Sequence, residues 1–371
     1  MKGHRKIYQL LLAVALFLGG AALLVYLVDP FFHYHAPWFG LKAVEDEKEY
    51  QVPGMLKNFE YEGVLAGSSV VMSMNTDTLK ERFGCETVKA VGGSAAAPLL
   101  DDYLDIAFEN HEISHVFYGV DVFSFYNPPD MQTISDDVEF LVNENPFDDV
   151  EYLWNMDIIG GKIPDMIETS QDENYQEGLI YQLNKDVPVG PEGVLKMHCP
   201  GAGAVQEAKP LTWQDAYVTE NIDRLEARVL ENPDTEFLFF IPPYSIVWWD
   251  DAYEKGLLDT YLYTLERCME RLLPYENVRF YGTEFNEAAT ITDMYQYMDY
   301  IHGSVPVTKR MAQKVGSPED EITLDTYRSE LAQLRDVFER FRARVETEGY
   351  GFIYEGPIEG VRMEKFWWQR S

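Results

Sequence analysis

The chain has 371 residues, of which 46% are hydrophobic and 14% aromatic, so it can bury a large core and is not a disordered protein. Its 63 acidic and 30 basic residues give a formal net charge of -33, which would repel a polyanion and excludes nucleic acid as a partner. Three cysteines, Cys85, Cys199 and Cys268, show no CxxC spacing and therefore point to neither a zinc site nor a redox pair.

The N-terminal segment predicts a membrane anchor. Residues 7–28 carry no charge, and as a helix they would measure about 33 Å, enough to cross a hydrocarbon core of about 30 Å. Three basic residues precede this run and Asp29 follows it, which predicts a cytoplasmic tail at 1–6 and an extracytoplasmic remainder. A cleaved signal peptide is the alternative, but the run is long for one and lacks a small-x-small cleavage site.

The next segment, residues 29–60, is interpreted as a juxtamembrane linker. It opens with DPFFHYHAPWFG, whose aromatic side chains fit the interface between lipid headgroups and water. His33 and His35 are two possible metal ligands in this stretch. Histidines beside a membrane interface are more often part of an amphipathic surface, so we expect no metal here.

Strand-like and helix-like segments then alternate. Five short apolar runs bounded by glycine or proline predict strands at 61–69, 86–94, 114–123, 235–245 and 277–284. Helical periodicity lies between and after them, at 76–84, 99–110, 220–232, 258–276 and 324–349. This alternation predicts a three-layer α/β/α domain over residues 61–348, with a mainly parallel five-stranded sheet in flavodoxin-like order.

Two regions interrupt or follow this pattern. Residues 127–215 are acidic, rich in Asp, Asn, Gly and Pro, and are interpreted as an insertion packed over the edge of the sheet, either as a solvated cap or as a docking surface for a membrane partner. Within it, HCPGAGAV at 198–205 resembles a glycine-rich phosphate loop but has no preceding strand and no P-loop lysine, so we expect an ordinary loop. The C-terminal tail, residues 349–371, suggests no function.

Polar residues follow three of the predicted strands, at the edge where ligands bind in such folds. They are Gly67-Ser68-Ser69, Gly92-Gly93-Ser94 and Gly119-Val120-Asp121, and a fourth stretch, Asp299-x-x-His302, follows the fifth strand. A serine hydroxyl needs a base within hydrogen-bond reach and a third group that orients the base. Asp299 and His302, three apart, would face the same way on a helical turn and supply both.

In this order the four stretches resemble the four blocks of the SGNH (GDSL-type) hydrolase and acyltransferase superfamily. The resemblance implies that Ser69 is the nucleophile, because aligning Gly67 places it where the family carries its serine. It also implies that Gly93 supplies an oxyanion N–H together with that of Ser69, and that Asp299 and His302 complete the catalytic triad.

At the third block the family has asparagine where this chain has Asp121. An ionised carboxylate accepts hydrogen bonds but donates none, so Asp121 is an uncertain third oxyanion residue. Three arrangements are open: Asp121 is protonated, it points elsewhere, or the oxyanion relies on the N–H groups of Ser69 and Gly93 alone. Losing one oxyanion donor typically lowers the rate about 100- to 1,000-fold.

The plan of one anchor plus an external domain is similar to that of the proteins of D-alanyl teichoic acid synthesis and alginate acetylation. Those proteins work beside membrane-bound O-acyltransferases, so such an enzyme is an expected partner. The implied substrate is an acyl ester of a cell-envelope glycan. No cofactor is implied.

Further residues are candidates for substrate binding. Ser68 adjoins the nucleophile, and Tyr244, Trp248 and Trp249 follow the fourth strand, where aromatic rings stack on sugars; core packing is an equal interpretation of these aromatic residues.

The segment HEISH, from His111 to His115, matches a zinc-protease signature that requires a continuous helix. The segment falls between a predicted helix and a predicted strand, so we expect a polar loop and not the helix that a zinc site of this type requires.

Three hypotheses follow for function. The first is a membrane-anchored extracytoplasmic serine esterase or O-acyltransferase that uses Ser69, His302 and Asp299. The second is a non-catalytic accessory protein that keeps the same fold to bind glycan or a membrane acyltransferase, which the asparagine-to-aspartate departure at position 121 favours. The third, a zinc peptidase, rests on HEISH alone.

Overall fold

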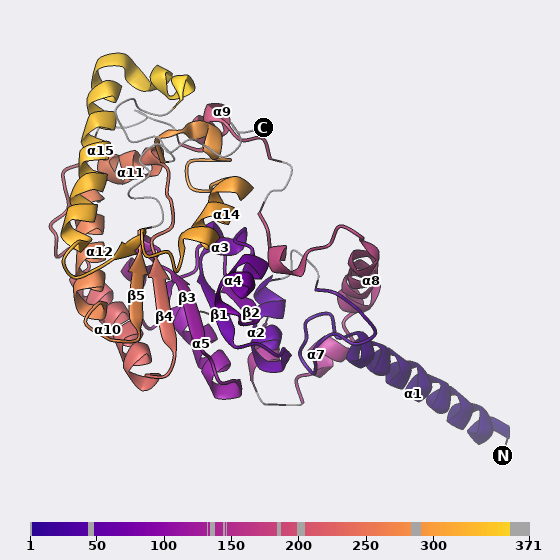
Figure 1. Cartoon of the computed structure of the whole chain (residues 1–371). Coiled ribbons are helices and arrows are strands. Elements are labelled where there is room, and N and C mark those ends of the chain that lie inside the picture. The colour runs from indigo at the N-terminus through magenta and orange to yellow at the C-terminus, as the bar shows by residue number, and fades with distance from the viewer. Residues whose placement is uncertain are drawn as a thin grey trace.

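The computed structural model describes residues 2–43, 48–131, 133, 138–143, 145, 147–183, 187–198, 205–282 and 291–356. Within these ranges the chain forms an α/β protein built on one mixed, mainly parallel sheet, with an apolar helix, α1 (Lys2–Val28), that extends away from the rest of the structure (Figure 1).

The sheet has six strands in the order β2-β1-β3-β4-β5-β6. The first five are parallel and correspond to the predicted strands: β1 (Gly63–Gly67), β2 (Thr87–Val91), β3 (His115–Gly119), β4 (Glu236–Phe240) and β5 (Val278–Tyr281). Their side chains are almost all buried, which explains why each strand reads as a continuous apolar run. The expectation of five strands was wrong by one, because β6 (Glu321–Ile322) adds two residues antiparallel to β5.

All five predicted helices are present: α4 (Thr76–Phe83), α5 (Ala97–Asn110), α10 (Asp215–Glu231), α12 (Leu258–Leu272) and α15 (Tyr327–Glu348). Contacts link α5 to α10 and α10 to α12, while α4 contacts α14 (Val305–Lys314). Helix α15 packs on α12 and on α11 (Ile246–Glu254), and the short 3-10 helix η6 (Gly349–Glu355) folds back onto α15. Residues 357–371 of the predicted tail lie outside the described ranges.

The segment predicted as a linker contributes to the core. Phe31 and Phe32 are buried, and helix α2 (Lys48–Asn58) packs against α5 and β2. The backbone of Phe31 and Phe32 passes so close to α2 that a Cβ at Gly54 would lie 2.3 Å from the carbonyl oxygen of Phe31. These residues therefore fix the end of α1 to the domain instead of forming an extended tether.

The 3-10 helix η1 (Val122–Tyr126) follows β3 and precedes the insertion. The described part of the insertion contains short helices: α6 (Glu139–Val142), α7 (Val150–Leu153), the π-helix η3 (Ile158–Lys162), α8 (Ile163–Gln171), η4 (Glu177–Leu179) and α9 (Pro191–Met197). Its parts take different positions. Helix η4 contacts α4, near the edge strand β2, whereas α7 and η3 contact α1.

A buried lysine ties the insertion to the edge of the sheet. Lys89 on β2 is 1% exposed, and its Nζ donates hydrogen bonds to the carbonyl oxygens of Met72 at 2.6 Å and Ile180 at 2.7 Å. Burial disfavours the ammonium and lowers the pKa of Lys89 to about 7, despite the opposing effect of the Asp77 charge.

This lysine predicts a pH dependence of stability. In the unfolded chain a lysine has a pKa of about 10.4, so between about pH 7 and 10 the unfolded state binds a proton that the folded state does not. The Lys89 contribution to the free energy of unfolding is therefore expected to rise with pH across that window. Urea unfolding of Lys89→Met should lack this rise, and Lys80→Met, at an exposed lysine, should keep it. Equal slopes for wild type and Lys89→Met would contradict the prediction.

Helix α1 has the length and composition of a membrane span. Residues His4–Val28 reach a mean hydropathy of 2.6, and only 11% of the most apolar stretch is buried. A core helix of a soluble domain would be mostly buried, so these features fit a membrane anchor or a signal sequence.

Candidate active site

The candidate nucleophile lies at the carboxyl end of β1. Ser69 is the first residue of a short helix, α3 (Ser69–Met72), and the hydroxyl of Ser68 caps this helix by accepting the N–H of Val70 at 3.4 Å. A Cβ on Gly67 or on Gly119 would lie 2.7 Å from a methyl group of Val71. The two glycines therefore let α3 pack directly against the ends of β1 and β3, with Ser69 half-buried beside them.

The candidate base lies on a loop after β5 and not on the helical turn predicted from its spacing. Backbone pairing between Tyr297 and Gly303 closes this loop, and the N–H of Met298 donates to the carbonyl of His302 at 3.0 Å. Inside the loop, Asp299 Oδ1 accepts the backbone N–H groups of Ile301 at 2.7 Å and His302 at 2.8 Å. The aspartate side chain therefore replaces the backbone acceptor that a helix would have supplied.

The structure brings the three predicted residues together. Ser69 Oγ lies 2.8 Å from His302 Nε2, and His302 Nδ1 lies 2.8 Å from Asp299 Oδ2. These distances are satisfied when Nδ1 carries the ring proton and Nε2 accepts the hydroxyl proton. The arrangement has the geometry of a nucleophile, a base and an orienting carboxylate, although 233 positions separate the serine from the histidine.

Asp299 is held in its charged form. Its burial raises the carboxyl pKa, but the hydrogen bond and charge of His302 and the two backbone N–H bonds outweigh that effect, so the pKa of Asp299 is lowered overall. An ionised carboxylate at this position stabilises the imidazolium that forms when His302 takes a proton.

Contacts from the end of β4 position the loop, and these were not predicted. Ser245 Oγ donates to the carbonyl of Tyr300 at 2.6 Å, and Tyr297 OH donates to the carbonyl of Pro243 at 2.8 Å. Both bonds join residues more than fifty positions apart. The sequence signal for Ser245 was only its place after a predicted strand, and no local pattern singles out Tyr297.

Asp121 is fully buried beneath the nucleophile and accepts hydrogen bonds through both oxygens. Oδ2 accepts the backbone N–H of Ser68 at 3.0 Å, and Oδ1 accepts the hydroxyl of Tyr244. Burial raises the pKa of Asp121, and these hydrogen bonds offset that only in part. Burial, reinforced by the Asp121 charge, also raises the pKa of Tyr244 well above its usual value, so the phenol stays a donor. Both carboxylate oxygens of Asp121 are therefore occupied as acceptors, by Ser68 and by Tyr244.

This pairing predicts different effects for two substitutions of Asp121. Asp121→Ala would leave the Ser68 N–H and the Tyr244 hydroxyl without an acceptor, at about 1–3 kcal/mol of unfolding free energy for each. Asp121→Asn is expected to be tolerated, since its amide oxygen accepts from Ser68 and its amide nitrogen donates to the Tyr244 oxygen. Urea unfolding compares the two variants, and equal destabilisation would contradict this role.

The remaining oxyanion candidates are backbone groups. Ser69 occupies the first position of α3, where an N–H has no partner within the helix. Gly93 is exposed in the turn after β2, with open space where a side chain would stand, and β2 pairs with β1 so that Val91 lies opposite Gly67. The start of α3 and the turn after β2 therefore lie at the same edge of the sheet.

The predicted substrate-binding side chains are buried. Ser68 is 0% exposed, Tyr244 and Trp249 are 2% exposed, and Trp248 is 7% exposed. Trp248 stacks on Tyr244 with ring centroids 4.2 Å apart, and Ser245 caps α11, the helix that carries Trp248 and Trp249. Their burial argues against stacking on a sugar and favours the alternative interpretation as core packing.

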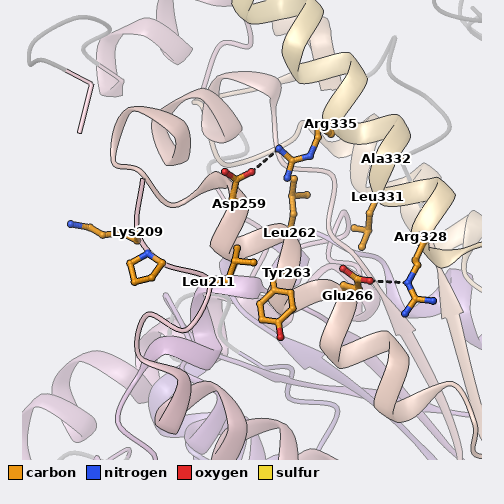
Figure 2. Close-up of a pocket in the computed structure, with 11 residues that line it drawn as sticks. Lys209, Leu211, Asp259, Leu262, Tyr263, Glu266, Arg328, Leu331, Ala332 and Arg335 are labelled. Carbon is orange, nitrogen blue, oxygen red and sulfur yellow. Dashed lines mark hydrogen bonds and ion pairs between the residues drawn. The ribbon is translucent and has the colours of Figure 1, made fainter. Parts of the chain in front are cut away.

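A groove of about 590 Å³ lies elsewhere, between α12 and α15 (Figure 2). Leu262 and Leu331 line its floor, while the ion pair of Arg335 with Asp259, at 2.6 Å, and that of Arg328 with Glu266, at 2.8 Å, cross it. None of the triad residues lines this groove, so cavity volume does not mark the candidate site.

The HEISH segment is a connection, as predicted. His111 is the extended residue that ends α5, and His115 is the first residue of β3, so the two histidines do not share a helix face.

The two juxtamembrane histidines have other partners. His33 pairs with Asp149 at 3.1 Å and His35 stacks on Trp38. Over the described parts of the chain, no three His, Cys, Asp or Glu side chains cluster to hold a metal ion. In the HCPGAGAV motif, residues 199–204 lie outside the described ranges.

In comparisons with known proteins, no family model, no curated protein and no solved structure matches the chain.

Proposed function

We propose that this protein is a membrane-anchored serine esterase or O-acyltransferase of the SGNH type. The observation that carries the proposal is the continuous hydrogen-bonded chain from Ser69 Oγ through the ring of His302 to Asp299 Oδ2, with both distances at 2.8 Å. The candidate nucleophile is partly exposed at the carboxyl edge of a mainly parallel sheet, which is where α/β proteins bind ligands.

Two further features support the family. The parallel strands follow the order 2-1-3-4-5, which is the flavodoxin-like order. The candidate residues also occur in the chain order of the SGNH blocks, with the serine after β1, Gly93 after β2, Asp121 after β3 and the Asp-x-x-His pair after β5.

The proposed reaction begins when Ser69 Oγ attacks the carbonyl carbon of an ester while His302 Nε2 takes the hydroxyl proton. The carbonyl oxygen gains negative charge and is held by the backbone N–H groups of Ser69 and Gly93. The tetrahedral intermediate collapses, His302 returns the proton to the leaving alcohol, and an acyl-serine remains. Water or an acceptor hydroxyl then repeats these steps in reverse and regenerates Ser69.

The proposed location follows from α1. Lys2, Arg5 and Lys6 before the apolar run favour a cytoplasmic N-terminus, which leaves the catalytic domain outside the cytoplasm. Esters on a cell-envelope glycan are the proposed substrates and a membrane-bound O-acyltransferase the proposed partner, on the strength of the family resemblance and of this location.

Covalent labelling tests the proposal. An organophosphonate probe mimics the tetrahedral intermediate and is expected to modify Ser69 stoichiometrically, as mass spectrometry of the labelled peptide would show. Ser68 is the matched internal control, because it neighbours Ser69 but is buried and caps α3. A folded protein that takes no label, or takes it equally after Ser69→Ala, would refute the catalytic role.

A non-catalytic accessory role is the second candidate. The observation in its favour is Asp121, which accepts two hydrogen bonds and offers the oxyanion no donor. An accessory protein would bind glycan or the membrane acyltransferase with the same affinity after Ser69→Ala, and it would show no turnover of p-nitrophenyl acetate.

A further inference from the structure

The apolar run of α1 is exposed without interruption only up to Gly20; beyond it, Leu23, Leu24 and Tyr26 are exposed, whereas Val25 and Val28 are buried. From Ile7 to Gly20 every residue is exposed, and this stretch measures about 21 Å at the rise of a helix, against a hydrocarbon thickness of about 30 Å. The rest of the apolar run, from Ala21 to Val28, must complete the span. Val25 and Val28 in this part are buried against the rest of the chain.

Elements of the insertion pack against α1. Helices α7 and η3 contact α1, and Trp154 Nε1 donates to the backbone carbonyl of Leu18 at 2.9 Å. Leu18 lies ten positions before Val28, or about 15 Å along the helix axis. If α1 crosses the bilayer, Trp154 therefore contacts the helix well inside the span, on the membrane side of Val28. Figure 1 shows α7 and α8 beside the end of α1 that joins the domain.

We name residues 147–167 the collar. Several of its apolar side chains face outward: Phe147 is 83% exposed, Met156 71%, Val150 50%, Ile167 41% and Trp154 40%. Exposed apolar surface in a folded domain commonly marks a contact with a membrane or with another protein. Tryptophan, with an apolar ring and one N–H donor, is enriched at the membrane interface.

The charges of the collar limit its depth. Glu151, Asp157 and Asp165 are exposed, and charged carboxylates must stay in water or at the headgroups because their burial in hydrocarbon is costly. Interfacial helices enter the acyl boundary by about 5–10 Å, and Trp154, which contacts Leu18 about 15 Å from Val28, reaches farther along α1 than that. Because these side chains are acidic, they are not attracted to anionic lipid headgroups. Binding of the collar to the membrane would therefore depend on burial of its apolar side chains.

We propose that the collar is a second membrane contact, which enters the interfacial layer of the outer leaflet beside α1 and holds the domain at a fixed height and tilt above the bilayer. The inference rests on α1 being a membrane anchor, as proposed above, but it does not depend on catalysis.

Depth-dependent quenching tests this contact in the full chain reconstituted into phosphatidylcholine vesicles. Met156→Cys, in a Cys199→Ser background whose other cysteines, Cys85 and Cys268, are buried, would carry an environment-sensitive fluorophore. Leu230→Cys is the matched control, since Leu230 is an exposed apolar residue, at 56%, on α10. We expect nitroxide lipids to quench the label at 156 several-fold more than the label at 230, with or without added phosphatidylglycerol.

A third label, at Leu12→Cys in α1, separates the possible failures. Quenching at 12 without quenching at 156 would overturn the collar contact and leave the anchor intact, whereas no quenching at 12 would overturn the anchor itself. Protection of position 156 from a thiol reagent in native membranes, without quenching in pure lipid, would assign the surface to a protein partner and also overturn the proposal. Esterase activity enters none of these readouts.

Discussion

Ser69→Ala and His302→Ala are each expected to lower kcat for p-nitrophenyl acetate by roughly 10⁴- to 10⁶-fold, with little change in KM. In the proposed mechanism Ser69 Oγ forms the covalent bond, and His302 Nε2, which lies 2.8 Å away, is the base. Without either group the acyl-serine cannot form. The residual rate would come from binding and from the oxyanion N–H groups alone.

The double variant gives the sharper result. Two residues that act in one step lose their effect together, so Ser69→Ala/His302→Ala should be no slower than either single variant. If the decrease in kcat of the double variant equals the product of the two single-variant decreases, the two side chains act independently, and the proposed mechanism is wrong. Ser304→Ala is a suitable control, because Ser304 lies two residues from His302 and occupies the N-cap position of α14 without a capping hydrogen bond from its side chain.

Much of this site could be predicted because its signals are local. Buried parallel strands are continuous apolar runs, so β1 and β5 were recognisable, and residues directly after such strands meet at one edge of the sheet. Ser69 follows β1 by this rule, whereas His302 comes well after the end of β5 at Tyr281 and was singled out by its Asp-x-x-His spacing and by the family resemblance. The aspartate partner of His302 is three positions away and needed no long-range information.

The features that sequence did not predict depend on distant contacts. The orientation of Asp121 is set by Tyr244, which lies 123 positions later, and no local pattern links the two. Strand β6 has two residues, too few to show a periodicity. Residues 29–60 were interpreted as a linker from their place after the predicted anchor. Their burial, at Phe31, Phe32 and α2, depends on contacts with distant parts of the chain such as α5 and β2.

Asp299→Asn is expected to lower kcat by about 10⁴-fold, at least as much as Asp299→Ala does. The reason lies in the two backbone N–H groups, of Ile301 and His302, that point at Oδ1. An asparagine keeps its oxygen toward these donors, which turns its NH₂ group toward His302 Nδ1. Nδ1 must then accept, so the ring proton moves to Nε2, where it faces Ser69 and prevents His302 from acting as a base.

Stability should respond to the same substitution in a pH-dependent way. The pKa of Asp299 is lowered in the folded chain, so the charged carboxylate contributes stability above the unfolded pKa of about 3.9, and this contribution is lost as the pH falls through the lowered value. The difference in unfolding free energy between wild type and Asp299→Asn is therefore expected at neutral pH and should shrink in acid.

Asp293→Asn is the matched control for both measurements. Asp293 caps the 3-10 helix η5 (Met294–Gln296) on the same loop by accepting the N–H of Tyr295 at 3.1 Å, much as Asp299 accepts backbone N–H groups. It differs in that its other oxygen accepts from Gln296 and not from a histidine. A loss of kcat in Asp299→Asn but not in Asp293→Asn would tie the effect to the His302 tautomer. Equal losses in both would reduce Asp299 to a structural cap, and Ser69 would then lack an oriented base.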